Sequence, residues 1–178
     1  MILSEQYVRF RREARKFAHE VIEPRATMHD LTGAFVKENV QALAERGWLG
    51  IPWPKDLGGM GLDYQSYAIA VEEVSRVCAS TGLTMAAHTS LGTYPIYKFG
   101  TTEQKEKYIP RLARGVYLGV FGLTEPNAGS DAAGIESTAR KTDQGYVING
   151  SKRFITSASY AGTVIVAASL DRKLGRKG

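Results

Sequence analysis

The chain has 178 residues and a net charge of +5, with 43 % hydrophobic and 23 % charged residues. This composition is typical of a globular protein, and the length allows one domain and part of another. No apolar run approaches the roughly 20 residues of a membrane-spanning helix, and no secretory signal or other targeting signal is visible. We therefore expect a cytoplasmic protein. The single cysteine, Cys78, excludes an internal disulfide.

Neither a nucleic-acid site nor a metal site is expected from the polar residues. The basic residues are spread along predicted helices without interleaved aromatic side chains, a pattern that gives little support to nucleic-acid binding. The three histidines, His19, His29 and His88, are scattered and show no metal-ligand spacing. His88 falls in a segment of small residues, so we expect it to be a packed core histidine.

The first part of the chain is predicted to be helical, because apolar residues recur at three- and four-residue spacing. The first helix is expected to stop at Pro24, and the second to end near Gly47. Residues 48–63 are rich in Pro and Gly and predict an irregular loop. Helical spacing then resumes at Tyr67.

Local signals mark the last predicted helix and its end. Thr101, followed three residues later by Gln104, is typical of a capping box. Pro110 is expected to bend that helix or split its end. After Gly115 the apolar period changes to that of strands. Helices followed by strands predict an α+β arrangement with a boundary near Gly115.

Short segments after this boundary are predicted to be strands. They lie at residues 117–123, 137–141, 146–149, 152–156 and 163–169. The dipeptides between them, Gln144-Gly145, Asn149-Gly150 and Ala161-Gly162, are turn and hairpin signals. The chain then runs into a polar segment at 171–178, which would leave an open sheet edge and suggests a domain that is cut short.

One candidate site lies at residues 121–131, where a predicted strand runs into a loop of Pro, Gly, Asn and Ser. Such a loop can turn successive backbone N–H groups towards an anion, and Ser130 can add a hydroxyl donor. Thr124 and its main chain can hydrogen-bond a planar heterocycle. By itself, the segment is explained as well by a strand and a simple turn.

The second candidate site lies at residues 149–156. It predicts a hairpin turn at Asn149-Gly150 followed by a strand. Phe154 and Thr156 would then lie on one face, because strand side chains alternate. An aromatic ring beside a hydroxyl can stack on a planar ligand and donate to it, although both are also ordinary sheet residues.

Together, the order, spacing and residue identities of the two segments resemble those of the acyl-CoA dehydrogenase family. The first is similar to that family's LTEP..GSD motif and the second to its NG.K.(W/F)IT motif. The resemblance extends over nearly the whole chain, through residues 50–52, 58–61, 71–73 and 99–105. Residues 87–91 and 126–130 are most similar to the short-chain, butyryl-CoA branch.

The resemblance implies an N-terminal all-helical domain, residues 1–115, followed by a truncated, antiparallel β-barrel-like flavin-binding domain, residues 116–178. It also implies FAD-dependent α,β-desaturation of a short-chain fatty acyl-CoA, with electrons passing to electron-transfer flavoprotein. Family members form homo-oligomers, tetramers at full length. The family's glutamate base lies in a C-terminal helical bundle, so we assign no catalytic residue here and do not promote Glu125. We expect this chain alone to be inactive.

Carried over by motif position, the resemblance assigns the cofactor-binding residues. They are Phe121, Gly122, Leu123, Thr124, Gly129, Ser130, Phe154, Ile155 and Thr156. Gly129 and Ser130 would lie by the pyrophosphate, and Ser130 would also touch the acyl-CoA. Phe154, where many relatives carry Trp, would pack on the isoalloxazine, with Thr156 near its reactive nitrogen.

Two alternatives stay open. An acyl-CoA oxidase of the same fold would pass its electrons to oxygen, and the rate at which air reoxidises the reduced flavin would separate the two enzymes. The chain can also be a non-catalytic acyl-CoA-binding or oligomerisation remnant that holds no flavin.

Overall fold

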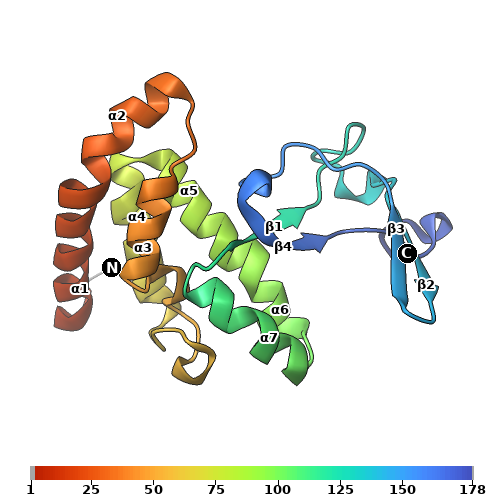
Figure 1. The fold of residues 1–178 in the computed structure, drawn as a ribbon, viewed down its shortest axis with the longest axis horizontal. Coiled ribbons are helices and arrows are strands. Elements are labelled where there is room, and N and C mark those ends of the chain that lie inside the picture. The colour runs from red at the N-terminus through yellow and green to blue at the C-terminus, as the bar shows by residue number, and fades with distance from the viewer. Residues whose placement is uncertain (1–2, 178) are drawn as a thin grey trace.

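The computed structural model describes residues 3–177, in which helices occupy the first part and strands the last (Figure 1). The helices are α1 (Glu5–Phe17), α2 (Glu23–Thr32), α3 (Lys37–Glu45), α4 (Tyr64–Val77), α5 (Ala79–Ala87), α6 (Tyr94–Phe99) and α7 (Thr102–Ala113). The strands are β1 (Leu118–Gly122), β2 (Thr138–Thr142), β3 (Gly145–Asn149) and β4 (Ala161–Val166). The predicted mixture of a helical N-terminal part and a later sheet is confirmed.

The predicted stop at Pro24 is wrong. A π-helical turn, Ala18–Ile22, joins α1 to α2, so the helical path continues through this point. Pro24 follows the π-helical turn, in which the Glu23 N–H bonds five residues back to the Ala18 carbonyl, so this wider turn carries the helix past a residue that has no N–H to donate. The path ends instead at Gly33, whose φ of +65° forms a left-handed cap that favours glycine.

The predicted capping box is present at the start of α7. Thr101 Oγ1 accepts a hydrogen bond from the Gln104 N–H at 3.2 Å, and Gln104 Oε1 accepts one from the Thr101 N–H at 2.9 Å. Pro110 lies inside α7, which continues to Ala113, so it does not split the helix.

The helical core is built around Trp48. Leu43, Ile69 and Met85, from α3, α4 and α5, are buried beside it, and the Phe17 ring lies 4.7 Å from the Trp48 ring. These contacts come from four separate segments, so burial of one large aromatic side chain holds the helices together.

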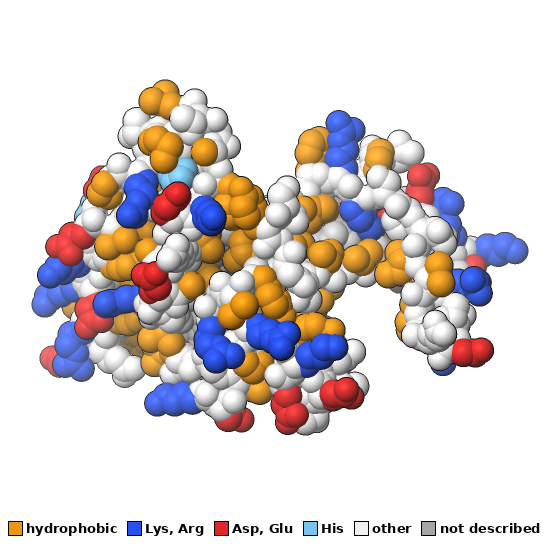
Figure 2. Space-filling view, viewed as in Figure 1, with side chains coloured by type: hydrophobic (Ala, Val, Ile, Leu, Met, Phe, Trp, Pro, Cys, Tyr) orange, Lys and Arg blue, Asp and Glu red, His pale blue; other side chains and the backbone are white. Residues whose placement is uncertain are grey.

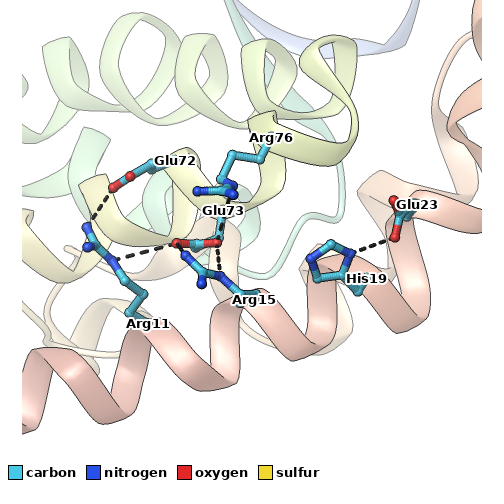
Figure 3. A network of polar contacts seen from close by, with 7 residues as sticks. All are labelled: Arg11, Arg15, His19, Glu23, Glu72, Glu73 and Arg76. Atoms are coloured by element: carbon cyan, nitrogen blue, oxygen red, sulfur yellow. Dashed lines mark hydrogen bonds and ion pairs between the residues drawn. The ribbon is translucent and has the colours of Figure 1, made fainter.

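A network of charged side chains docks α1 on α4 (Figure 3). Glu73 is buried, and the Arg15 guanidinium donates to its two carboxylate oxygens at 2.9 and 3.0 Å. Arg11 and Arg76 lie within 3.6 and 3.9 Å of the same carboxylate. The hydrogen bonds from Arg15 lower the pKa of Glu73, so the buried group stays charged and compensated.

The strands form two separate pairs in the described part of the chain. β1 pairs with β4 in parallel, from Leu118 opposite Ala161 to Gly122 opposite Val166. β2 and β3 form an antiparallel hairpin whose turn lies at the predicted Gln144-Gly145 signal. The expected antiparallel barrel is therefore not seen. β4 runs parallel to β1, and the two strand pairs do not join into a closed sheet.

One further strand prediction and two turn predictions are wrong. Residues 152–156 form no strand, because Phe154 adopts a φ of +57°, in the left-handed region that strands exclude. Asn149-Gly150 ends β3 instead of turning a hairpin, and Ala161-Gly162 lies within β4.

Buried His88 holds β1 against the helices. The Gly119 N–H donates to its Nδ1 at 3.0 Å, and its Nε2 lies 3.1 Å from the Leu112 carbonyl. Since the first partner only donates and the second only accepts, the ring is neutral and protonated on Nε2. Burial lowers the pKa of His88 to about 4. A Cβ on Gly92 would lie 2.2 Å from the Gly119 carbonyl carbon, so the two backbones also touch. The predicted core histidine is confirmed.

We predict that His88 makes stability depend on pH. Its pKa is about 4 in the folded chain and about 6.5 when unfolded, so the unfolded chain binds the proton first as the pH falls. The free energy of unfolding should decrease between pH 6.5 and 4, with a contribution from His88 of about 3 kcal/mol. Urea unfolding at several pH values should show a smaller decrease for His88→Gln. Parallel pH profiles for the two proteins would contradict this.

Candidate functional site

The two segments singled out from the sequence lie side by side, joined by hydrogen bonds. Lys152 Nζ donates to the Leu123 carbonyl at 3.0 Å, and the Arg153 N–H donates to the Thr124 carbonyl at 2.8 Å. Lys152 Nζ also lies 2.6 Å from Glu125 Oε1. The structure thus connects the end of β1 directly to the loop that carries Phe154.

Glu125 is the centre of this connection. Its side chain is buried, and it accepts hydrogen bonds from Lys152 and from the backbone N–H groups of Glu136 and Ser137. Burial would raise the pKa of Glu125, but these hydrogen bonds outweigh it and lower the pKa to about 2. A carboxylate held this firmly in its charged form is a poor proton acceptor, so its role is to position the loop.

Sequence reasoning did not single out Lys152 as part of the site. The motif could have indicated Lys152, since this lysine belongs to the same motif as Phe154 and is the lysine nearest to it in the sequence. Periodicity could not pair it with Glu125, because 26 intervening residues, 126–151, separate the two in the sequence.

The loop after Glu125 presents small, exposed residues. Glu125 and Ala128 exchange backbone hydrogen bonds at 2.9 and 3.3 Å, which closes a tight turn. Gly129 and Ser130 follow and are exposed. A Cβ on Gly129 would meet no atom within 4 Å, so a ligand can approach the backbone closely here. Ser130 also lines an open pocket that reaches Ser169.

Phe154 is held in an unusual exposed position. Its side chain is 79 % exposed, its φ is +57°, and the Arg153 guanidinium lies 4.6 Å from the ring centre. A left-handed conformation is rare for a bulky side chain and marks a constraint imposed by the surroundings. Thr156 is exposed as well. The expected alternation of the two side chains along a strand is absent, but both remain available to a ligand.

The remaining predicted cofactor-binding residues are less exposed than Gly129, Ser130, Phe154 and Thr156. Gly122 is buried, while Phe121, Leu123, Thr124 and Ile155 are half-buried. The Gly122 carbonyl accepts from the Ala167 N–H at 3.0 Å, just after β4. The loop 121–125 is therefore held by hydrogen bonds on both sides.

A metal-binding cluster and a membrane-spanning helix are both absent from residues 3–177. No group of three His, Cys, Asp or Glu side chains is placed to hold a metal ion. In the same part of the chain, no helix is sufficiently long and apolar to cross a membrane.

Comparison with known protein families matches nearly all of the chain. The model of the acyl-CoA dehydrogenase N-terminal domain matches residues 4–116, and that of the middle domain matches residues 120–178. A probable acyl-CoA dehydrogenase of Bacillus subtilis, YngJ, is 50 % identical over 93 % of this chain and 44 % of its own length. The short-chain specific enzyme of Clostridium acetobutylicum is 46 % identical over 94 % of this chain and 44 % of its own length.

Solved structures share the fold. Butyryl-CoA dehydrogenase from Megasphaera elsdenii has a TM-score of 0.92 at 40 % identity, over 100 % of this chain and 48 % of its own. An acyl-CoA dehydrogenase from Bacillus anthracis, solved with FAD, has a TM-score of 0.84 at 37 % identity, over 93 % and 29 %. A chain from a study of the electron transferring flavoprotein of Acidaminococcus fermentans has a TM-score of 0.92 at 41 % identity, over 98 % and 46 %.

The chain thus spans about half the length of the curated relatives it matches. The matches include both motif segments and the helices before them, which confirms the resemblance seen in the sequence. The chain belongs to the acyl-CoA dehydrogenase family, a family of oxidoreductases in fatty acid metabolism.

Proposed function

We propose that the chain forms part of the flavin site of an FAD-dependent dehydrogenase that desaturates short-chain fatty acyl-CoA thioesters. The observation that carries the proposal is the union of residues 121–125 with the Phe154 loop through Lys152. This union places an aromatic ring, a hydroxyl and an open glycine turn on segments that hold one another in place.

The exposed groups fit FAD. An unpacked Phe154 ring offers a face for the isoalloxazine, and the space beside Gly129 suits a pyrophosphate. The residues proposed to hold the cofactor are Phe121, Gly122, Leu123, Thr124, Gly129, Ser130, Phe154, Ile155 and Thr156. When bound, FAD supplies the acceptor for the hydride that leaves the β-carbon.

The chain's own residues position and shield the reactants. The ring of Phe154 would exclude water from one side of the cofactor, and Thr156 would donate a hydrogen bond to it. Ser130 would contact the acyl-CoA. The Glu125–Lys152 pair is internally compensated, so it stiffens the site without adding net charge. We assign no base, because the pKa of Glu125 is about 2 and its partners hold it ionised.

The proposed substrate class and electron acceptor are supported by the similarity of this chain to known proteins. The short-chain enzyme of C. acetobutylicum and the butyryl-CoA dehydrogenase of M. elsdenii support a short acyl chain. Electron-transfer flavoprotein is proposed as the acceptor, which agrees with the match in the A. fermentans study. We also propose a cytoplasmic homo-oligomer.

FAD retention can be tested directly on the purified chain. The purified chain, mixed with excess FAD and desalted, should keep the visible flavin bands. Gly129→Ala should lose at least about tenfold in FAD affinity, because a methyl group would occupy the space of the pyrophosphate, a loss comparable to about 1.4 kcal/mol.

Gly134→Ala is the matched control, because its added Cβ would make only ordinary contacts, 3.5 Å from Asp131 Oδ2. Both variants should unfold at the same temperature as the parent chain. A colourless parent chain would refute FAD binding by this chain, and equal affinities of the two variants would refute the assignment of Gly129.

The buried pair of Glu125 and Lys152 should contribute to both stability and FAD binding. Lys152→Met leaves Glu125 without its cationic partner, which should reduce the free energy of unfolding by about 3 kcal/mol and weaken FAD binding. The double variant Lys152→Met/Glu125→Gln should recover part of the stability, since it removes the buried charge. Urea titrations of Lys152→Met, Glu125→Gln and the double variant measure this coupling, and strictly additive losses would show that the pair has no specific role.

A further inference from the structure

Two aromatic rings connect the helical part to the loop that carries Phe154. The rings of Phe35 and Tyr160 stack with their centres 3.9 Å apart and their planes at 14°. Phe35 lies between α2 and α3 and packs against buried residues of two core clusters, which include Leu43 and Ile22. Tyr160 is the last residue before β4. The stack therefore attaches the far end of the loop to a rigid support.

The loop is held at both ends and is strained between them. Lys152 and Arg153 fix its start on the 123–125 segment. Phe154 and Ser157 both have left-handed φ values, +57° and +61°. Each costs on the order of 1 kcal/mol for a residue with a Cβ, so the conformation persists only if the surroundings enforce it.

Internal hydrogen bonds alone give limited support. The Ala158 N–H donates to the Ile155 carbonyl at 3.2 Å, and the Tyr160 N–H donates to the Ser157 carbonyl at 2.9 Å. Both bonds lie within the loop and move with it. Only contacts that leave the loop can set its position, and at its end the ring of Tyr160 makes such a contact.

The stack is packed against the core on the Phe35 side and open on the Tyr160 side. Phe35 and Tyr160 both line a hollow between α3 and residues 114–118. Tyr160 is 47 % exposed, so its ring adds little buried apolar area to the fold as a whole. Its loss should therefore affect the position of the loop more than global stability.

We propose that Phe35 and Tyr160 are a positioning pair that fixes residues 153–160, and so directs Phe154 and Thr156 towards the ligand. The part that concerns the flavin rests on the proposed function. Neither ring is assigned to touch the cofactor, and the pair acts through the backbone of the loop.

The test compares amide hydrogen exchange of residues 153–160 in the chain without added FAD. Tyr160→Ala and Phe35→Leu should each speed exchange there by about threefold to tenfold, the range that an aromatic pair supplies. Tyr160→Phe keeps the stack and should match the parent chain. Tyr146→Ala is the control, because Tyr146 is 58 % exposed on β3, away from the loop.

Unchanged exchange in Tyr160→Ala would overturn the proposal. Faster exchange across all the helices in Tyr160→Ala would also overturn it, because the stack would then be a general packing contact. FAD affinity gives the second readout, with a similar loss in Tyr160→Ala and none in Tyr160→Phe. If the parent chain retains no FAD, FAD binding by this chain alone is refuted, while the exchange comparison still decides whether the pair positions the loop.

Discussion

The buried ion pair between Glu125 and Lys152 is the constraint on which the candidate site depends. A carboxylate inside the protein is tolerated only when charged and hydrogen-bonded partners replace the lost water. Lys152 supplies the charge, and the backbone at Glu136 and Ser137 supplies further donors. Because these partners lie far along the sequence, satisfying one buried group brings three segments together. The exposed groups of the site are arranged around this buried centre.

This centre is attached to the helices by contacts of a different kind. His88 and the contact between Gly92 and Gly119 fix β1 through neutral hydrogen bonds and backbone packing. On the face drawn in Figure 2, apolar side chains are exposed near the junction of the helical part and the strands, and Lys and Arg side chains gather below this junction. The contacts of His88, Gly92 and Gly119 thus hold β1 in place without any charged side chain.

Much of the fold could be predicted from local signals. Apolar periodicity gave the helices, the capping box at Thr101 was correct, and the β2–β3 hairpin follows its turn signal. The motif segments were brought together as the resemblance implied. The parallel β1–β4 pair could not be predicted, because pairing direction depends on where distant segments meet. The left-handed backbone at Phe154 was also missed, since it is imposed by anchors outside the segment and not by its own residue types.

The parallel pairing of β1 and β4 has a consequence for how the chain acquires its structure during synthesis. β1 leaves the ribosome before residues 123–160 and β4. It therefore cannot form its strand pair until β4 has been synthesised. His88 and Leu112 precede β1 in the sequence, and the site that accepts the Gly119 N–H is therefore complete when β1 emerges. The helices can thus capture the strand early. Closing the long segment onto it is the slow, entropically costly step, and during that step the edge of β1 is open to other chains.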